Sequence, residues 1–272
     1  MTLISDSALN RSGLARISDL AAMECVNAMR KLERDQNAFI AMHPKILSAE
    51  YKWPRDPLHT WSRQWEYPYV YHHISRWREQ SPSAPRIIDI GSGVTFFPFS
   101  VARLGCDVLC LDNDPVVDQD MRKAINIVPA APGKVEMRLI DGLPYPIESE
   151  HADCVYCISV LEHIPFFVPI IQEISRMLRP NGLFILTIDI ALGGINAQLD
   201  VSPYKDLMAE LTKYFTTTHP HTAIHPKEML TNFHPSSCWR ERVRPLLYRI
   251  YEQVGIPRGG HLTCEGFVLI KR

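Results

Sequence analysis

The stretch from Arg86 to Thr95 limits the possible fold of this 272-residue chain more than any other. A run of apolar β-branched residues surrounds Asp89 and leads into Gly91 and Gly93, which are separated by one residue. Such a run, followed by a glycine turn and a return to apolar residues, is typical of a buried strand that leads into a helix. Glycine suits this turn because a Cβ would block a positive φ and the close approach of a ligand. The pattern predicts a nucleotide beside the first N–H groups of the helix.

The spacing of the glycines bears on which nucleotide binds. A dinucleotide fingerprint requires a third glycine for close packing of helix and strand, but the chain has Phe96 at that position. A bulky ring there disfavours a pyrophosphate and therefore a nicotinamide cofactor. Asp112 ends the next apolar run, about 20 residues after the turn, where a carboxylate accepts hydrogen bonds from both ribose hydroxyls.

From residue 83 onward, strand-like and helix-like segments alternate, which predicts a mostly parallel sheet with helices on both faces. We expect a Rossmann-like, doubly wound α/β domain over 83–272, with an antiparallel terminal strand at 266–270 and an insertion at about 191–262. The insertion should contain helices over 203–215 and 243–254. The other expected strands lie near 86–90, 107–112, 135–140, 153–159 and 183–189, and the other expected helices near 97–104, 115–126 and 166–178.

Residues 1–82 are expected to form a helical and aromatic cover over that domain. Residues 1–13 lack periodicity and predict a mobile tail or a loose cover, whereas an amphipathic pattern from 14 to about 42 predicts one helix or two. That pattern should end at His43-Pro44, because a residue that precedes proline is disfavoured in a helix. The next segment, 51–73, holds three of the five tryptophans, so its rings either contact the cofactor or form an apolar seam. A further helix is expected from 69 to about 80.

The composition excludes several classes of partner. A net charge of −1 gives no electrostatic basis for binding nucleic acid or an anionic membrane, which favours a small-molecule or protein substrate. The chain begins with polar residues and has no run of about 18 apolar residues, so we expect a cytoplasmic protein. The seven cysteines, and the histidines at 219, 221 and 225, lack the spacing of a metal site, and we expect no metal.

Further motifs follow the glycine turn in a recognisable order. They are the segment Asp141-Gly142-Leu143-Pro144, the run ADCVYCISVLEHI at 152–164 and the run MLRPNGLFI at 177–185. Together with the turn they resemble the class I S-adenosylmethionine-dependent methyltransferases over about residues 86–190. The first motif of that family, DxGxGxG, is matched by Asp89, Gly91 and Gly93, with Thr95 at the third glycine position.

The resemblance implies S-adenosyl-L-methionine as the cofactor and gives roles to the matching residues. Asp112 matches the acid that binds the ribose, and Asp141 matches the acid that meets the adenine amino group. Arg63 is a candidate for binding a carboxylate of the cofactor or of the substrate, with a solvated surface arginine as the alternative. The cofactor-binding residues expected in this way are Asp89, Gly91, Ser92, Gly93, Asp112, Asn113, Asp141, Gly142, Ser159, Arg63 and Tyr67.

Methyl transfer from a sulfonium is an in-line displacement, so it mainly requires that the nucleophile and the methyl carbon be aligned and desolvated. An oxygen nucleophile gains from a general base that titrates near neutrality, which a histidine supplies. His163 is the best-placed candidate, because it follows the fourth expected strand. His72 and His73, in the aromatic segment, are further candidates, and each of the three has a structural role as its alternative.

We therefore expect a methyltransferase that acts on a small-molecule acceptor, with oxygen as the first choice of acceptor atom. Alternatives are N- or S-methylation of a small metabolite and a catalytically silent scaffold that binds the cofactor. A nicotinamide oxidoreductase is less favoured because of Phe96. We expect no nucleic-acid or membrane partner, and the N-terminal helix allows a homodimer.

Overall fold

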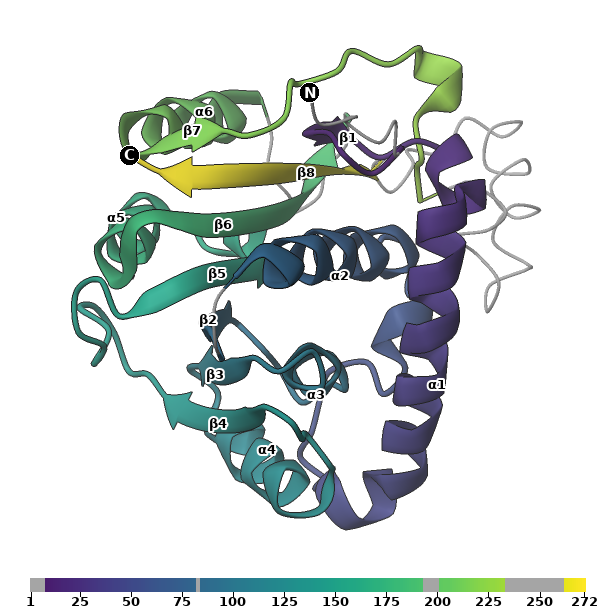
Figure 1. Ribbon diagram of the computed structural model, residues 1–272, viewed down its shortest axis with the longest axis vertical. Coiled ribbons are helices and arrows are strands. Elements are labelled where there is room, and N and C mark those ends of the chain that lie inside the picture. Colours follow the sequence, from purple (N-terminus) through teal and green to yellow (C-terminus); the bar gives the residue numbers. More distant parts are fainter. Residues whose placement is uncertain (1–7, 82–83, 193–200, 233–261) are drawn as a thin grey trace, which may run out of the picture.

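The computed structural model describes residues 8–81, 84–192, 201–232 and 262–272, which are built around one mixed sheet (Figure 1). Its strands follow the order β1-β8-β6-β5-β2-β3-β4, and β7 pairs with β8 as well. Strands β2 to β6 are parallel and β8 is antiparallel to β6, which confirms the predicted Rossmann-like sheet with its antiparallel terminal strand. The strands span Gly13–Leu14 (β1), Arg86–Ile90 (β2), Asp107–Asp112 (β3), Lys134–Leu139 (β4), Ala152–Ile158 (β5), Leu178–Ala191 (β6), Phe215–Thr217 (β7) and Leu262–Lys271 (β8).

Helices cover both faces of this sheet (Figure 1). Buried side chains of α1 to α4 form one core with the sheet, and those of α5 and α6 form a second core. The helices span Met23–Ile46 (α1), Arg63–Gln80 (α2), Phe97–Ala102 (α3), Pro115–Ile127 (α4), Val168–Met177 (α5) and Val201–Tyr214 (α6). Short 3-10 turns lie at Ser18–Ala21 (η1), Pro57–His59 (η2), Leu161–His163 (η3) and Pro226–Glu228 (η4).

The register of the central strands brings their carboxyl ends to one edge of the sheet. Ile90, the last residue of β2, lies opposite Leu111 of β3 and Cys157 of β5. Strand β5 is buried along nearly its whole length because it has a neighbour on each side and a core on each face. The loops that follow these strands therefore meet at a common edge, where doubly wound sheets bind their ligands.

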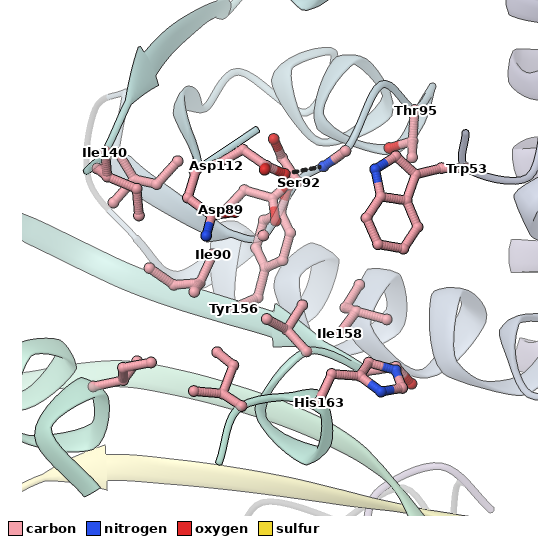
Figure 2. Close-up of a pocket in the computed structure, with 18 of the residues that line it drawn as sticks. Trp53, Asp89, Ile90, Ser92, Thr95, Asp112, Ile140, Tyr156, Ile158 and His163 are labelled. Atoms are coloured by element: carbon pink, nitrogen blue, oxygen red, sulfur yellow. Dashed lines mark hydrogen bonds between the residues drawn. The ribbon is translucent and has the colours of Figure 1, made fainter. Parts of the chain in front are cut away.

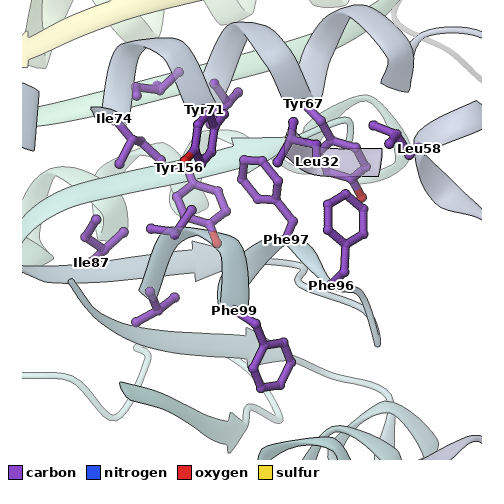
Figure 3. Close-up of a cluster of buried hydrophobic side chains, with 14 of the residues drawn as sticks. Leu32, Leu58, Tyr67, Tyr71, Ile74, Ile87, Phe96, Phe97, Phe99 and Tyr156 are labelled. Carbon is purple, nitrogen blue, oxygen red and sulfur yellow. The ribbon is translucent and has the colours of Figure 1, made fainter. Parts of the chain in front are cut away.

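A cluster of aromatic rings packs between α2 and the residues that follow the glycine turn (Figure 3). The ring of Tyr67, from α2, stacks on Phe97 with centroids 4.7 Å apart and meets the edge of Phe96 at 5.5 Å. Phe97 in turn contacts Tyr156 of β5 at 5.5 Å. Phe96, at the position of the missing third glycine, is buried in this cluster. About half of the aromatic segment is thus the start of a helix that packs on the sheet.

Two prolines lie inside helices, which corrects the predicted helix ends. Helix α1 continues past His43 and Pro44 to Ile46, and α2 begins at Arg63 with Pro68 inside it. A proline removes one helical hydrogen bond and crowds the preceding turn. Here burial outweighs that cost, because Ile46 and the side chains around Pro68 are almost fully buried in the core.

The N-terminal segment is part of the sheet, contrary to the expected loose cover. Gly13 and Leu14 form β1, whose partners on β8 are Gly266 and Glu265. Leu9 and Ser12 are fully buried, so at least the described part of this segment, from residue 8, is firmly packed. The division into a cover over 1–82 and a main domain over 83–272 stays a prediction.

Part of the expected insertion is described. Helix α6 matches the helix expected at 203–215, whereas the one expected at 243–254 lies outside the described residues. Across the described ranges, no helix combines the length and the apolar character needed to cross a bilayer.

Candidate active site

A cavity of about 590 Å³ opens at the carboxyl ends of β2, β3 and β5 (Figure 2). One part of its wall is the glycine turn with the acids near the carboxyl ends of β2 and β3. The opposite part comes from the loop before α2, from the start of α2 itself and from the residues that follow β5. All eleven residues predicted to bind a cofactor lie on this wall. They are Asp89, Gly91, Ser92, Gly93, Asp112, Asn113, Asp141, Gly142, Ser159, Arg63 and Tyr67.

The glycine turn has the backbone conformation that its sequence predicts. Gly91 and Gly93 have φ values of 68° and 56°, a region that other residues rarely adopt. A Cβ on Gly91 would come within 2.6 Å of the Val160 side chain, whereas a Cβ on Gly93 would meet only Thr95, at 3.7 Å. Gly91 is thus required for packing, and Gly93 leaves room on the cavity side.

Two acids stand at the ends of the strands beside this turn. Burial raises the pKa of Asp89 to about 8, although the hydroxyl of Tyr156 donates a hydrogen bond to its carboxylate at 2.9 Å. Asp112 accepts hydrogen bonds at 3.0 Å from the backbone N–H groups of Gly93 and Asp114. Burial still raises the pKa of Asp112. Asp112 therefore brings a carboxylate to the cavity, whereas Asp89 is mostly protonated at neutral pH.

The wall beyond β4 is open and exposed. Asp141, Gly142 and Leu143 lie there, and no atom lies within 4 Å of the place where a Cβ on Gly142 would stand. Asn113, which follows Asp112, is also exposed on this side. A flat ring that is bound at this wall would therefore have space above Gly142 and acids at its edge.

The third part of the wall is built from α2 and the end of β5. The guanidinium of Arg63 pairs with the carboxylate of Glu66, and the Ser159 hydroxyl donates to the same carboxylate at 2.6 Å. Ser159 has a φ of 46° and its N–H donates to Thr187 at 3.0 Å, so the backbone is firmly held in a left-handed conformation. Arg63 and Ser159 both line the cavity, whereas Glu66 is fully buried behind them.

The three candidate histidines have different surroundings. His163 lies in η3 and lines the cavity, and burial together with the charge of Arg63 lowers its pKa. His72 and His73 are not part of the cavity wall. The His72 ring lies 2.9 Å from the Asn10 side chain, and the His73 ring lies 2.9 Å from the Leu9 carbonyl. The structure therefore brings one candidate base of the three to the cavity.

Three apolar residues on the cavity wall did not figure among the predicted site residues. Trp53, Leu143 and Phe166 come from three different loops, and their exposed fractions are 56%, 43% and 82%. Exposed large apolar side chains that gather at a cavity indicate a binding surface. Trp53 could have been found from the sequence, because it lies in the aromatic segment 51–73. The only indication of Phe166 in the sequence is that it follows the Leu161-Glu162-His163 turn, so the fold was needed to identify it.

No group of three or more metal-ligating side chains is placed to hold a metal ion within the described ranges. Six cysteines are described there, and all six are buried free thiols.

A family model described as "Methyltransferase domain" matches residues 88–186. The mitochondrial ubiquinone biosynthesis O-methyltransferase of Schizosaccharomyces pombe is 29% identical over 107 residues, which are 39% of this chain and 38% of that protein. The ubiquinone biosynthesis O-methyltransferase of Xanthomonas axonopodis pv. citri is 29% identical over 139 residues, 50% of this chain and 54% of that protein. The chain thus spans about half the length, or less, of these curated relatives.

Solved structures share the fold at low sequence identity. The cyclase SpnF aligns with a TM-score of 0.52 at 15% identity and covers 96% of this chain and 99% of its own. Phosphoethanolamine N-methyltransferase 2 of Haemonchus contortus, in complex with S-adenosyl-L-methionine, aligns with a TM-score of 0.50 at 15% identity over 73% of this chain and 51% of that one. At such identities the likeness shows the fold alone.

Proposed function

From the match of residues 88–186 to a methyltransferase domain, we propose that the chain is a class I S-adenosylmethionine-dependent methyltransferase that moves a methyl group to an oxygen atom of a small-molecule acceptor. The observation that carries the proposal is the meeting of the glycine turn, Asp112 and His163 in one cavity. A relative named as an O-methyltransferase supports oxygen as the acceptor atom.

The cavity fits the cofactor of this family. S-adenosylmethionine supplies an activated methyl group on a sulfonium, so its site must accept a cation. Asp112 and Asp141 lie on the wall, and Arg63, the one arginine or lysine among the described lining residues, pairs with Glu66, which favours a cation. In this proposal Asp112 binds the ribose hydroxyls and Asp141 meets the adenine.

The methionyl end of the cofactor is assigned to the wall formed by α2. There Arg63 receives the carboxylate, since its guanidinium offers donors in a planar fork. Tyr67 lies on the same helix, one turn further, and burial raises its pKa to about 12, so it remains a neutral hydroxyl. Gly91 and Gly93 let the backbone of the turn approach the ligand.

His163 is proposed as the general base that takes the proton from the acceptor hydroxyl. Its lowered pKa keeps the imidazole neutral at pH 7, the form that accepts a proton. The rim of Trp53, Leu143 and Phe166 supports an acceptor whose reacting oxygen is attached to an apolar body, because such a body would cover these exposed side chains.

The first experiment measures cofactor binding and product formation together. We expect Asp112→Ala to weaken S-adenosylmethionine binding at least about tenfold, as measured by calorimetry, because two ribose hydrogen bonds are lost. His163→Gln should leave that affinity within about twofold of wild type. It should lower the turnover of a phenolic acceptor by about 10²-fold or more, since a general base contributes that much.

The acceptor panel should contain phenols, aliphatic alcohols, amines and thiols, with formation of S-adenosylhomocysteine as the readout. Methylation of amines or thiols alone, with no effect of His163→Gln, would contradict the assignment of an oxygen acceptor. Cofactor binding without turnover on any member of the panel would favour a catalytically silent scaffold.

A further inference from the structure

Glu66 contacts two polar residues of the cavity wall, Arg63 and Ser159, although it is itself fully buried. One of its carboxylate oxygens pairs with Arg63 and the other accepts the hydrogen bond from Ser159. These partners come from different elements, the start of α2 and the end of β5, and both line the cavity. A single buried carboxylate therefore links the helix to the strand end at the site.

Two further carboxyl groups lie buried near Glu66 and Arg63. The carboxylates of Glu162 and Asp189 are also buried, and both act electrostatically on Arg63. Burial, followed by the charge of Glu66, raises the pKa of each of these two groups. Three carboxylates thus share one guanidinium, and Glu66 is the one in direct contact with it.

We propose that Glu66 is a positioning residue that holds Arg63 and Ser159 toward the bound cofactor; this inference rests on the proposed function, in which Arg63 receives the methionyl carboxylate. When Glu66 loses its charge, Glu162 and Asp189 ionise more readily, because the repulsion from Glu66 is gone. Oxygen Oε2 of Glu162 is buried and has no hydrogen-bond partner within the described residues. Arg63 would then be drawn toward these acids and away from the cavity.

The test compares two ligands on the full-length protein. Glu66→Gln keeps the size of the side chain and an oxygen for Ser159, but it cannot pair with Arg63. We expect this variant to bind S-adenosylmethionine at least about tenfold more weakly by calorimetry, since a buried charge-assisted contact is lost. Its affinity for the decarboxylated analogue of the cofactor should change less than about twofold, because that analogue gives Arg63 no carboxylate to bind.

Two further variants separate positioning from folding. In an Arg63→Met background, Glu66→Gln should have no additional effect on S-adenosylmethionine affinity, since the two residues act as one unit. Asp120→Asn removes another fully buried carboxylate, which pairs with Lys123 on α4, and should leave both affinities unchanged. If Glu66→Gln does not fold, Glu66→Asp retains the charge on a shorter side chain and the same two ligands are compared.

Equal weakening for both ligands would overturn the inference, because a purely structural role predicts that result. An unchanged or tightened affinity for S-adenosylmethionine would overturn it as well. If wild-type protein binds neither ligand, the proposed function itself fails, together with the inference that rests on it.

Discussion

Asp89 shows how far the surroundings of one residue change its chemistry. It is the next-to-last residue of β2 at the cavity, is 5% exposed, and has a pKa raised by burial to about 8. Nearby Asp112 adds repulsion that raises the pKa further, and the hydrogen bond from Tyr156 opposes it. In the free protein at neutral pH the carboxyl group is therefore mostly protonated.

This pKa predicts how the stability of the free protein depends on pH. Between the pKa of an unfolded aspartate, about 4, and the folded value of about 8, the folded state binds a proton that the unfolded state has released. The contribution of Asp89 to stability is therefore fully present below pH 4 and is lost as the pH rises toward 8. Asp89→Asn lacks this titration and keeps an oxygen for Tyr156.

Urea denaturation of both proteins at pH 5 and pH 8 measures the effect. We expect the stability of wild type relative to Asp89→Asn to fall by on the order of 3 kcal/mol over that range. A constant difference between the two proteins across the range would contradict the raised pKa.

The residues of the glycine turn could be placed from the sequence, because their spacing fixes the backbone conformation and the strand ends bring them together. The histidines could not be ranked with the same security. His72 and His73 lie in the same aromatic segment as Tyr67, and only the orientation of α2 about its axis places them on the side of Leu9 and Asn10. Glu66 is adjacent to a predicted site residue, but its contact with Ser159 joins positions 93 residues apart and is invisible in local spacing.

At the scale of elements, α2 lies close against the sheet because β8 offers it a glycine. A Cβ on Gly266 would stand 2.5 Å from the Tyr69 ring and 2.9 Å from Trp65. These rings are stacked with centroids 4.6 Å apart and are fully buried. The position of α2, and with it the position of Arg63 at the cavity, depends on this close contact.

We therefore expect Gly266→Ala to lower the free energy of unfolding by about 1–3 kcal/mol, because well-packed rings cannot yield without moving α2. Gly142→Ala is the matched control, since it has open space around it and should change stability by less than about 0.5 kcal/mol. Thermal and urea denaturation give both values. Similar losses in the two variants would show that the contact beneath α2 has no special importance.

The elements of the main sheet were predictable because each strand is a continuous apolar run between turn residues. The ends of α1 and α2 were not, because Pro44 and Pro68 carry a strong local signal against a helix. Tertiary burial overrides that signal, and burial is not visible in a local window. Gly13 and Leu14 were not recognised as a strand for a related reason. Two residues are too few to show the alternating pattern of a strand.

For the molecule as a whole, a buried ionic network fastens the N-terminal segment to α2. The Asp19 carboxylate pairs with Arg11, which is 6% exposed, and accepts hydrogen bonds from the Trp65 indole at 2.8 Å and from the Arg16 N–H at 2.9 Å. The Tyr69 hydroxyl donates to the Arg11 carbonyl at 2.8 Å. Removal of Asp19 would leave a buried guanidinium without its carboxylate.

Asp19→Ala should lower the free energy of unfolding by about 3 kcal/mol, because breaking one side of a buried pair leaves an uncompensated charge. Asp118→Ala removes a pair with the exposed Arg122 and should cost less than about 1 kcal/mol. Urea denaturation followed by tryptophan fluorescence measures both. A loss below about 1 kcal/mol for Asp19→Ala would mean that the network does not hold the segment in place.

The pairing of Gly13 with Gly266 and of β6 with β8 has a consequence for biosynthesis. A ribosome that adds about 5–20 residues per second releases β1 on the order of ten seconds or more before β8. During that interval one edge of β6 is unpaired, and the rings of Trp65 and Tyr69 on α2 cannot yet pack against Gly266. Translational pausing before residue 262 should therefore expose this protein to intermolecular strand pairing, and its yield in a cell should depend on how quickly β8 is made.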